Sequence, residues 1–238
     1  MSLQTANETA LARLKERFPW PEERPDFPDR EYGWGISDED LLLSHLPEEA
    51  SCILEIGSFL GGSARFFANA RPQATIICVD PWMDTHRPFV GRNAPELTEW
   101  LAKPDGCYQT FLSSNWGYRE RIVALRGFSP EALLPVFETG CRPDFIYIDG
   151  AHHYEAVLMD LCTCQVLFPD AVISGDDWRW SGLRIRSRIL RQVIRNHPIQ
   201  RAVKYFASRY KYKVHASKNT WVLSAGESRP TFEHAHAI

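Results

Sequence analysis

Short apolar runs and amphipathic segments alternate along most of the chain. Five runs of four or five mostly apolar residues predict strands, at 52–56, 75–79, 122–125, 145–148 and 171–174. Apolar residues at helical spacing predict helices around them, at 37–46, 64–70, 108–115, 130–137, 154–167, 183–195 and 202–208. Strands that alternate with helices are typical of a doubly wound, mostly parallel sheet with helices on both faces.

The two ends of the chain depart from this alternation. Leu11, Leu14 and Phe18 have helical spacing, and the proline-rich stretch 19–30 that follows cannot continue a helix. Near the other end, two strand-like runs, 212–216 and 220–224, flank a polar turn and predict an antiparallel hairpin. We therefore expect an N-terminal helix and arm over 1–36, one α/β domain over 37–226 and a tail over 227–238. Ser37, which precedes three acidic residues, is the expected cap of the first domain helix.

Composition agrees with a globular chain and excludes several classes. The chain has 238 residues, of which 44% are hydrophobic and 12% aromatic, enough for a sizeable core. No apolar run approaches the ~18 residues of a membrane helix, and the start lacks the apolar core of a signal peptide. We expect a cytoplasmic protein without membrane contact. The six cysteines form no C-x-x-C motif, so we expect neither structural zinc nor a disulfide framework.

Charge is distributed unevenly. The formal net charge is −3, yet residues 178–226 contain twelve Lys or Arg and no acidic residue. Four arginines fall on one side of the predicted helix 183–195, at Arg184, Arg188, Arg191 and Arg195. This basic face is either simply solvated or recognises an anionic partner, such as a phosphorylated or carboxylated substrate, a carrier protein or RNA. A pI near 6.2 and the lack of an RNA-binding motif argue against nucleic acid.

A glycine-rich loop follows the first strand. Gly57, Gly61 and Gly62 would let the chain turn sharply and approach a ligand, and the second strand ends in Asp80, an acid that can accept ribose hydroxyls. The spacing G-x-x-x-G-G suits a nucleoside without phosphates better than a dinucleotide, which disfavours an NAD-dependent oxidoreductase. The alternative is a plain strand-to-helix turn.

Three carboxylates follow two neighbouring strands. Asp149 ends the strand 145–148, and Asp176 and Asp177 follow the strand 171–174. Adjacent strands lie ~4.8 Å apart, so these acids can converge at the carboxyl edge of the sheet. A hard divalent cation such as Mg²⁺ would relieve their repulsion. Alternatively, one acid caps the next helix and another pairs with an arginine.

Four motifs taken together resemble the class I S-adenosylmethionine-dependent methyltransferases. They are Glu55-Ile-Gly-Ser-Phe-Leu-Gly-Gly-Ser63, Val79-Asp-Pro-Trp82, Phe145-Ile-Tyr-Ile-Asp-Gly-Ala-His-His-Tyr-Glu155 and Ile173-Ser-Gly-Asp-Asp-Trp178. More narrowly, they are similar to the bacterial group of macrocin-type sugar O-methyltransferases and cephalosporin hydroxylase-like proteins. The resemblance covers roughly 34–223 and implies a seven-stranded sheet whose last strand is antiparallel.

The resemblance also implies roles for single residues. Five would surround the methionine portion of the cofactor: Glu55, Gly57, Ser58, Gly61 and Ser63. Asp80 would hold the ribose, and the segment 127–129, with Ser129, would lie beside the adenine. Asp149 is expected both at the cofactor and, with Asp176 and Asp177, at the metal.

Two histidines stand three and four residues after Asp149. O-methylation needs an oxygen that has lost its proton, and histidine has suitable basicity near neutral pH. The resemblance implies that His152 is the base, with His153 the second candidate, although Ala151 stands where some relatives have an aspartate that serves this role. Each histidine could instead be a surface or capping residue.

The expected function is S-adenosylmethionine-dependent and Mg²⁺-dependent O-methylation of a small hydroxylated molecule of the sugar or natural-product type. The stretch 83–107 is long for a connection and is expected to form a substrate loop or cap. The alternative is a non-catalytic S-adenosylmethionine-binding partner of a biosynthetic enzyme. An anionic acceptor and a homo-oligomeric state both stay open.

Overall fold

The computed structural model describes residues 3–28, 32–83, 97–180 and 197–226. The chain forms two compact units. The first consists of Met1–Ile36 and Glu48–Pro143, and the second of Ser37–Pro47 and Asp144–Ile238. The helices of the described residues include none with the length and apolar character needed to cross a membrane.

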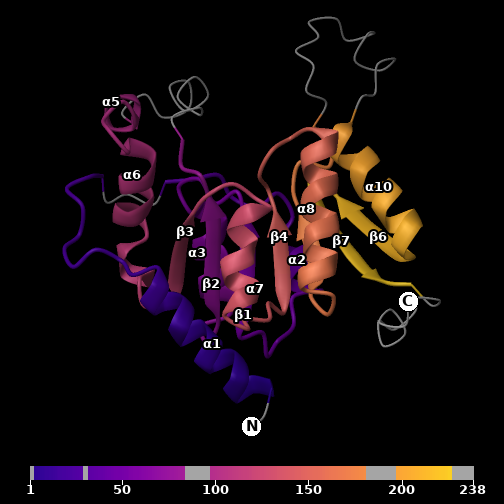
Figure 1. Cartoon of the computed structure of the whole chain (residues 1–238). Coiled ribbons are helices and arrows are strands. Elements are labelled where there is room, and N and C mark those ends of the chain that lie inside the picture. Colours follow the sequence, from indigo (N-terminus) through magenta and orange to yellow (C-terminus); the bar gives the residue numbers. More distant parts are fainter. Residues whose placement is uncertain (1–2, 29–31, 84–96, 181–196, 227–238) are drawn as a thin grey trace, which may run out of the picture. The chain divides into compact units, whose positions relative to one another are not determined.

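The first unit is built on three parallel strands in the order β3-β2-β1 (Figure 1). These are Cys52–Ile56 (β1), Thr75–Asp80 (β2) and Ile122–Arg126 (β3). Its helices are Leu3–Arg17 (α1), Gly62–Ala70 (α3), Leu97–Leu101 (α5), Gly106–Ser114 (α6) and Leu134–Glu138 (α7), with short 3₁₀ turns at Trp116–Tyr118 and Glu131–Leu133. Every residue of β1 and β2 is buried, as is typical of parallel strands covered on both faces.

The proline-rich stretch after α1 packs against this unit. The indole N–H of Trp20 donates to the backbone oxygen of Ile122 at 2.7 Å, and the Trp20 ring contacts the rings of Phe111 and Trp116. Phe27 packs against Trp100 of α5, with ring centroids 5.4 Å apart. Aromatic side chains therefore tie residues that the sequence presented as an arm to the body of the first unit.

The second unit contains the strands Phe145–Ile148 (β4), Val172–Gly175 (β5), Tyr212–Ser217 (β6) and Thr220–Ala225 (β7), in the order β4-β5-β7-β6. Its helices are Glu39–Leu43 (α2), Tyr154–Leu167 (α8) and Pro198–Tyr210 (α10). β4 and β5 are parallel, whereas β7 runs antiparallel to both β5 and β6. The predicted C-terminal hairpin is therefore present.

Together the strands make a seven-stranded, mostly parallel sheet with antiparallel strands at its C-terminal end. This confirms the predicted Rossmann-like fold class. The strands were predictable because apolar runs bounded by polar residues mark buried strands in such sheets.

Several helix details differ from the prediction. Asp38, not Ser37, caps α2: its carboxylate accepts the N–H of Leu41 at 3.3 Å, because the helix begins at Glu39. The predicted helix 130–137 is split into a 3₁₀ turn and α7, with Pro135 in the first turn of α7. Helix α5 lies within the predicted loop 83–107, whose residues 84–96 lie outside the described parts of the chain. The predicted helix 183–195, with its arginines, and the tail 227–238 lie outside them too.

Candidate cofactor loop and acidic cluster

The glycine loop joins β1 to α3. Gly61 has a φ of 81°, and a Cβ atom there would stand 2.4 Å from Nδ2 of Asn115, so this position excludes any side chain. The Asn115 amide donates to the backbone oxygen of Leu60 at 3.1 Å, and Arg65 of α3 donates to that same oxygen at 3.1 Å. Side chains from α3 and from the end of α6 thus fix the shape of the loop.

A segment from before the first strand covers this loop. A Cβ atom on Gly33 would lie 2.5 Å from the backbone N of Gly62, and one on Gly62 would lie 2.4 Å from the backbone oxygen of Trp34. The ring of Trp34 stacks on Phe59 of the loop, with centroids 4.8 Å apart and planes 18° apart. Arg65 donates to the backbone oxygen of Tyr32. We call residues 32–35 the strap.

Unpaired buried oxygens lie at the loop. Glu55 of β1 and the Ser58 hydroxyl are buried, and neither makes a hydrogen bond of normal length and angle. The Ser58 hydroxyl and the Cys78 thiol nevertheless lie close enough to Glu55 to interact with its carboxylate. Burial raises the pKa of Glu55, and the nearby hydroxyls of Ser58 and Ser63 oppose that rise. Buried polar groups without partners are rare, so these acceptors favour a site for a polar ligand over a plain turn.

Asp80 ends β2 and holds the loop from the other side. Its Oδ2 accepts the N–H of Phe59 at 2.9 Å, and its Oδ1 accepts the N–H of Trp82 at 2.6 Å. A carboxylate has about four lone-pair sites and can accept several hydrogen bonds at once. The backbone oxygen of Asp80 also accepts the N–H of Gly127 at 3.0 Å, which brings the segment with Ser129 beside it.

All predicted cofactor residues other than Asp149 therefore belong to the first unit. They lie on β1, β2 or the segments that follow the first three strands: Glu55, Gly57, Ser58, Gly61, Ser63, Asp80 and Ser129. Sequence reasoning missed Trp82 and Asn115, which bind the loop backbone. Trp82 directly follows the Asp80-Pro81 pair. Asn115 left no local signal, because its partners Leu60 and Arg65 are 55 and 50 residues away.

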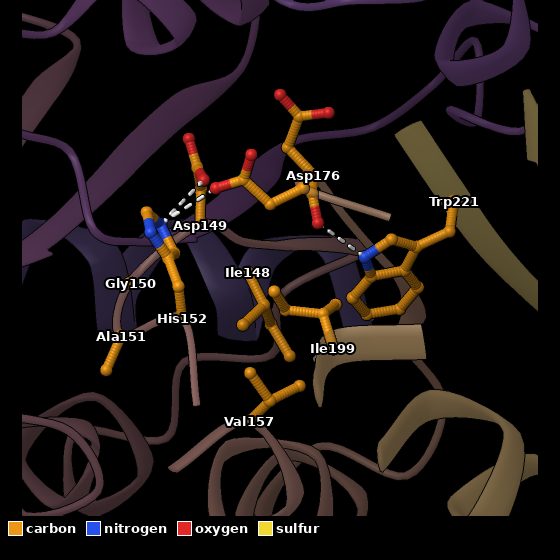
Figure 2. A pocket seen from close by; sticks show the side chains of 10 residues that line it. Ile148, Asp149, Gly150, Ala151, His152, Val157, Asp176, Ile199 and Trp221 are labelled. Carbon is orange, nitrogen blue, oxygen red and sulfur yellow. Dashed lines mark hydrogen bonds and ion pairs between the residues drawn. The ribbon is translucent and has the colours of Figure 1, made fainter. Parts of the chain in front are cut away.

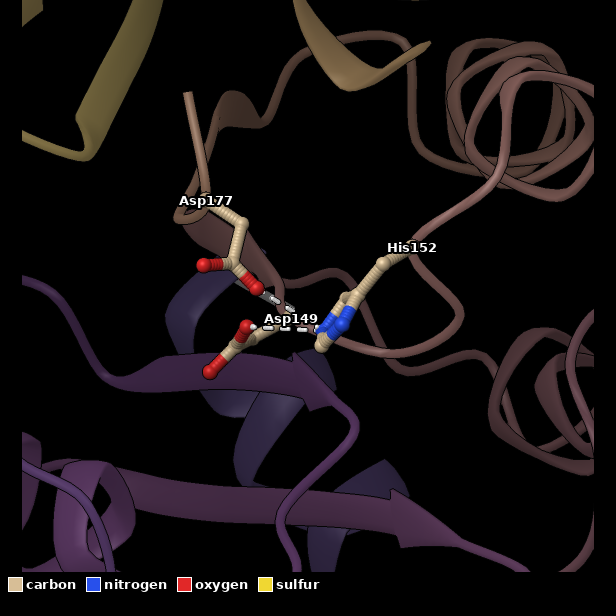
Figure 3. Close-up of side chains that lie close together, drawn as sticks. All are labelled: Asp149, His152 and Asp177. Atoms are coloured by element: carbon tan, nitrogen blue, oxygen red, sulfur yellow. Dashed lines mark ion pairs between the residues drawn. The ribbon is translucent and has the colours of Figure 1, made fainter. Parts of the chain in front are cut away.

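In the second unit, two carboxylates and a histidine converge (Figure 3). Asp149 follows β4, and Asp177 follows β5; β4 and β5 are paired, with Ile148 opposite Gly175. One side-chain ligand atom each from Asp149, His152 and Asp177 lie within 4.8 Å of one another. His152 Nε2 lies 2.9 Å from Asp177 Oδ2 and 3.8 Å from Asp149 Oδ1. We call these three residues the acidic cluster.

Asp176 lies beside the acidic cluster with different partners. Its Oδ1 accepts the hydroxyl of Thr220 at 3.3 Å, and its Oδ2 lies 3.5 Å from the hydroxyl of Ser37. The indole N–H of Trp221 donates to its backbone oxygen at 2.9 Å (Figure 2). Asp176 and the three residues of the acidic cluster line the same pocket, together with Ile148, Val157, Ile199 and Trp221.

The electrostatics of this pocket favour a cation. Burial and the charges of Asp176 and Asp177 raise the pKa of Asp149 to about 7, against the hydrogen bond from His152. Burial and the charge of Asp177 raise the pKa of Asp176 to about 6. Burial lowers the pKa of His152, but its bonds to Asp149 and Asp177 outweigh this and raise it to about 10. Protonated His152 therefore supplies positive charge that the carboxylates need.

The two histidines have different surroundings. His153 is exposed and stands at the N-terminal cap position of α8, where its side chain makes no capping bond. The ring of His152 meets Trp180 edge-on, with centroids 5.2 Å apart. Sequence reasoning missed Trp180, whose only signal was its place three residues after Asp177. The structure thus brings His152, and not His153, to the carboxylates.

Comparisons with known proteins agree with this fold. A family model described as a methyltransferase domain matches residues 54–178. A search of curated protein sequences finds no match. Solved structures share the fold at low identity.

A putative caffeoyl-CoA O-methyltransferase from Staphylococcus aureus is 16% identical over 93% of this chain and 95% of that chain, with a TM-score of 0.52. The MycE methyltransferase of the mycinamycin biosynthetic pathway was solved with Mg and S-adenosylhomocysteine (SAH). It is 16% identical over 93% of this chain and 57% of that chain, with a TM-score of 0.52. The O-methyltransferase TomG from Streptomyces achromogenes is involved in tomaymycin synthesis and was solved with S-adenosylmethionine (SAM). It is 18% identical over 93% of this chain and 90% of that chain, with a TM-score of 0.50.

Proposed function

Because the chain belongs to this methyltransferase domain family and is a SAM-dependent methyltransferase, we propose that it methylates a hydroxyl oxygen of a small molecule with the help of bound Mg²⁺. The observation that carries the proposal is the acidic cluster, in which Asp149, His152 and Asp177 bring ligand atoms within 4.8 Å of one another. Oxygen-rich clusters of this kind suit Mg²⁺, and imidazole suits proton transfer.

The glycine loop would hold the amino-acid end of SAM. The buried oxygens of Glu55 and Ser58 make no hydrogen bond of normal geometry, and the cofactor's ammonium group is a donor that could bind them. Asp80 would use its remaining lone pairs for the ribose hydroxyls, while the segment with Ser129 would border the adenine. The unpaired oxygens support this placement, since a ligand would remove the cost of leaving them buried.

Asp149 and Asp177 would be the principal metal ligands, with Asp176 the third carboxylate. Burial and the neighbouring carboxylates raise the pKa values of Asp149 and Asp176, which a cation at the pocket would lower again. The metal chemistry available at these carboxylates would be the Lewis acidity of Mg²⁺, which lowers the pKa of a nearby hydroxyl. The hydroxyls of Thr220 and Ser37 would continue to orient Asp176.

His152 would be the general base. Asp149 and Asp177 raise the pKa of His152 and so keep its ring protonated. A cation bound to these carboxylates would neutralise their charge and lower the pKa of His152, so that the ring loses its proton. Neutral His152 then takes the hydroxyl proton. SAM, when bound, would supply the methyl group to the deprotonated acceptor oxygen and would leave as SAH, whose sulfur keeps the electron pair of the broken carbon–sulfur bond. His153 has no part in these steps.

The first test is binding, because it needs no known acceptor. Calorimetry should show that SAM and SAH bind while NAD does not, and that Mg²⁺ binds to the wild type but hardly to an Asp149→Asn, Asp177→Asn double variant. Transfer of a labelled methyl group to a panel of hydroxylated sugars and natural products then separates an enzyme from a non-catalytic SAM-binding partner. Retained methyl transfer after complete metal removal would contradict the Mg²⁺ role.

A further inference from the structure

Two aromatic residues near Asp80 have unusual backbone conformations. Phe59 of the glycine loop and Trp82 after β2 both have a φ of 44°, in the left-handed region that bulky residues rarely adopt. Both side chains are buried, Phe59 at 8% exposure and Trp82 at 1%. Such conformations persist only where surrounding contacts enforce them, and they gather at functional sites.

Two hydrogen bonds link these residues through Asp80, and a third joins them directly. The Phe59 N–H donates to Asp80 Oδ2 at 2.9 Å, and the Trp82 N–H donates to Asp80 Oδ1 at 2.6 Å. The indole Nε1–H of Trp82 donates to the backbone oxygen of Phe59, also at 2.6 Å. Both backbone polar groups of Phe59 are therefore held by residues at the end of the next strand.

We propose that Trp82 is a positioning residue for the cofactor: its indole N–H fixes the Phe59 peptide and thereby the loop that meets the amino-acid end of SAM. The proposal rests on the proposed placement of SAM at this loop. Ser58, with its buried unpaired hydroxyl, directly precedes Phe59 in the chain, so a shift of the Phe59 peptide would move it.

The hydrogen bond can be separated from the packing of the ring. The Trp82 ring contacts Phe111 and Tyr108, with centroids 4.6 and 5.0 Å away. A Trp82→Phe substitution retains one aromatic ring for these contacts but removes the N–H donor together with the second ring of the indole. If that variant does not fold, replacing Trp82 by benzothienylalanine keeps a bicyclic ring and substitutes sulfur for the N–H.

Trp20→Phe is a matched control. Trp20 also belongs to the first unit, also contacts Phe111, and also donates its indole N–H to a backbone oxygen, that of Ile122 at 2.7 Å. That oxygen lies at the start of β3 and not in the glycine loop. Both substitutions therefore remove the same kind of hydrogen bond, and only one of them removes it from the loop.

The experiment measures the dissociation constants of SAH and of 5′-methylthioadenosine, which lacks the amino-acid end, together with thermal unfolding. For Trp82→Phe we expect SAH to bind ~5- to 10-fold more weakly, the effect of one lost hydrogen bond. Methylthioadenosine should change less than ~2-fold, because it lacks the amino-acid end that the loop would meet. Trp20→Phe should lower the unfolding temperature without changing either affinity.

Three results would overturn the positioning role: unchanged SAH affinity in Trp82→Phe, equal weakening of both ligands, or equal weakening in Trp20→Phe. The second and third would mean that the tryptophan acts through general stability alone. If the wild type binds neither ligand, the cofactor placement itself is wrong, and this proposal is overturned with it.

Discussion

His152 Nε2 lies 2.9 Å from Oδ2 of Asp177, so the predicted base and a predicted metal ligand are direct partners. This contact joins two functions that the sequence presented separately. A bound cation and the protonated His152 ring would both be stabilised by the same carboxylate charge. Cation binding should therefore lower the pKa of His152, and protonation of His152 should weaken cation binding.

Asp177→Asn should weaken Mg²⁺ binding at least ~10-fold, because it replaces a charged oxygen ligand with a neutral one. Asparagine tolerates the left-handed backbone of this position, where φ is 57°, so the fold should be kept. Calorimetric titration with Mg²⁺ measures the effect. Glu155→Gln is the charge-matched control, since Glu155 is an exposed acid of α8. Equal affinities in all three proteins would remove Asp177 from the metal site.

Asp176→Asn distinguishes a direct ligand from a neighbour. Its two oxygens are 3.3 Å from Thr220 Oγ1 and 3.5 Å from Ser37 Oγ, so we expect a smaller loss of Mg²⁺ affinity than in Asp177→Asn. The same titration compares the two. A larger loss for Asp176→Asn would make Asp176 the dominant ligand and restrict Asp177 to pairing with His152.

Chelation with EDTA should abolish methyl transfer to the true acceptor, and added Mg²⁺ should restore it. SAH affinity should stay within about twofold, because the loop residues and the acidic cluster are separate groups of side chains. Initial rates and parallel calorimetry with SAH provide both measurements. A rate that EDTA leaves unaltered would eliminate the metal from the mechanism.

His152→Ala should lower turnover ~10²- to 10⁴-fold, the usual contribution of a positioned general base. His153→Ala should keep most of its activity, since His153 is exposed and lies outside the acidic cluster. Turnover of both variants on an identified acceptor, with SAH and Mg²⁺ affinities alongside, decides the assignment. An inactive His153→Ala beside a normal His152→Ala would transfer the role, and a large loss of Mg²⁺ affinity in His152→Ala would make it a ligand.

Asp80→Ala should weaken SAM binding by more than ~10-fold, because a charged acceptor is worth ~1.5 to 3 kcal/mol per hydrogen bond. Unlike Trp82→Phe, it should weaken methylthioadenosine as well, since the ribose hydroxyls lose their acceptor. The unfolding temperature should also fall, because the N–H groups of Phe59 and Trp82 lose their partner. Unchanged affinity in a folded variant would refute the ribose role.

Glu55→Gln should stabilise the ligand-free protein at pH 8 while weakening SAM binding. Burial raises the folded-state pKa of Glu55 above its ordinary value of 4.5, so the folded protein loses stability as pH rises through that raised value. The neutral amide avoids this loss, so the gain in unfolding temperature should grow from pH 5 to pH 8. A gain that is constant from pH 5 to pH 8 would mean that Glu55 binds the same number of protons in the folded and the unfolded state, so that its folded pKa is not raised.

The strands, and the acidic residues at their ends, were predictable because a short stretch of sequence is enough to identify each of them. Apolar runs mark β1, β2, β4 and β5, and Asp80 and Asp149 follow such runs directly. Contacts between distant positions were not predictable in this way. The bond from Phe59 to Asp80 spans 21 residues, and the short helix α5 carries too few residues for a clear periodic pattern.

The predicted pairing of the site was close but incomplete for a physical reason. Spacing placed Asp149, Asp176 and Asp177 at neighbouring strand ends. Backbone geometry predicts no more than this, because it does not determine which side chains form contacts. Side-chain partners then separated the two adjacent aspartates, since Asp176 meets Thr220 while Asp177 meets His152. Choices of this kind depend on rotamers and on hydroxyls from β7, which is remote in sequence.

The strap over the glycine loop has a practical consequence for anyone who trims this protein for expression or crystallisation. A fragment that starts at residue 37, the expected domain boundary, would lose Tyr32, Gly33 and Trp34. It would leave Arg65 without one of its acceptors and expose the Phe59 ring to water. Minimal fragments should therefore retain the strap. If a shorter fragment is insoluble or does not bind the cofactor, the loss of the strap would explain that result.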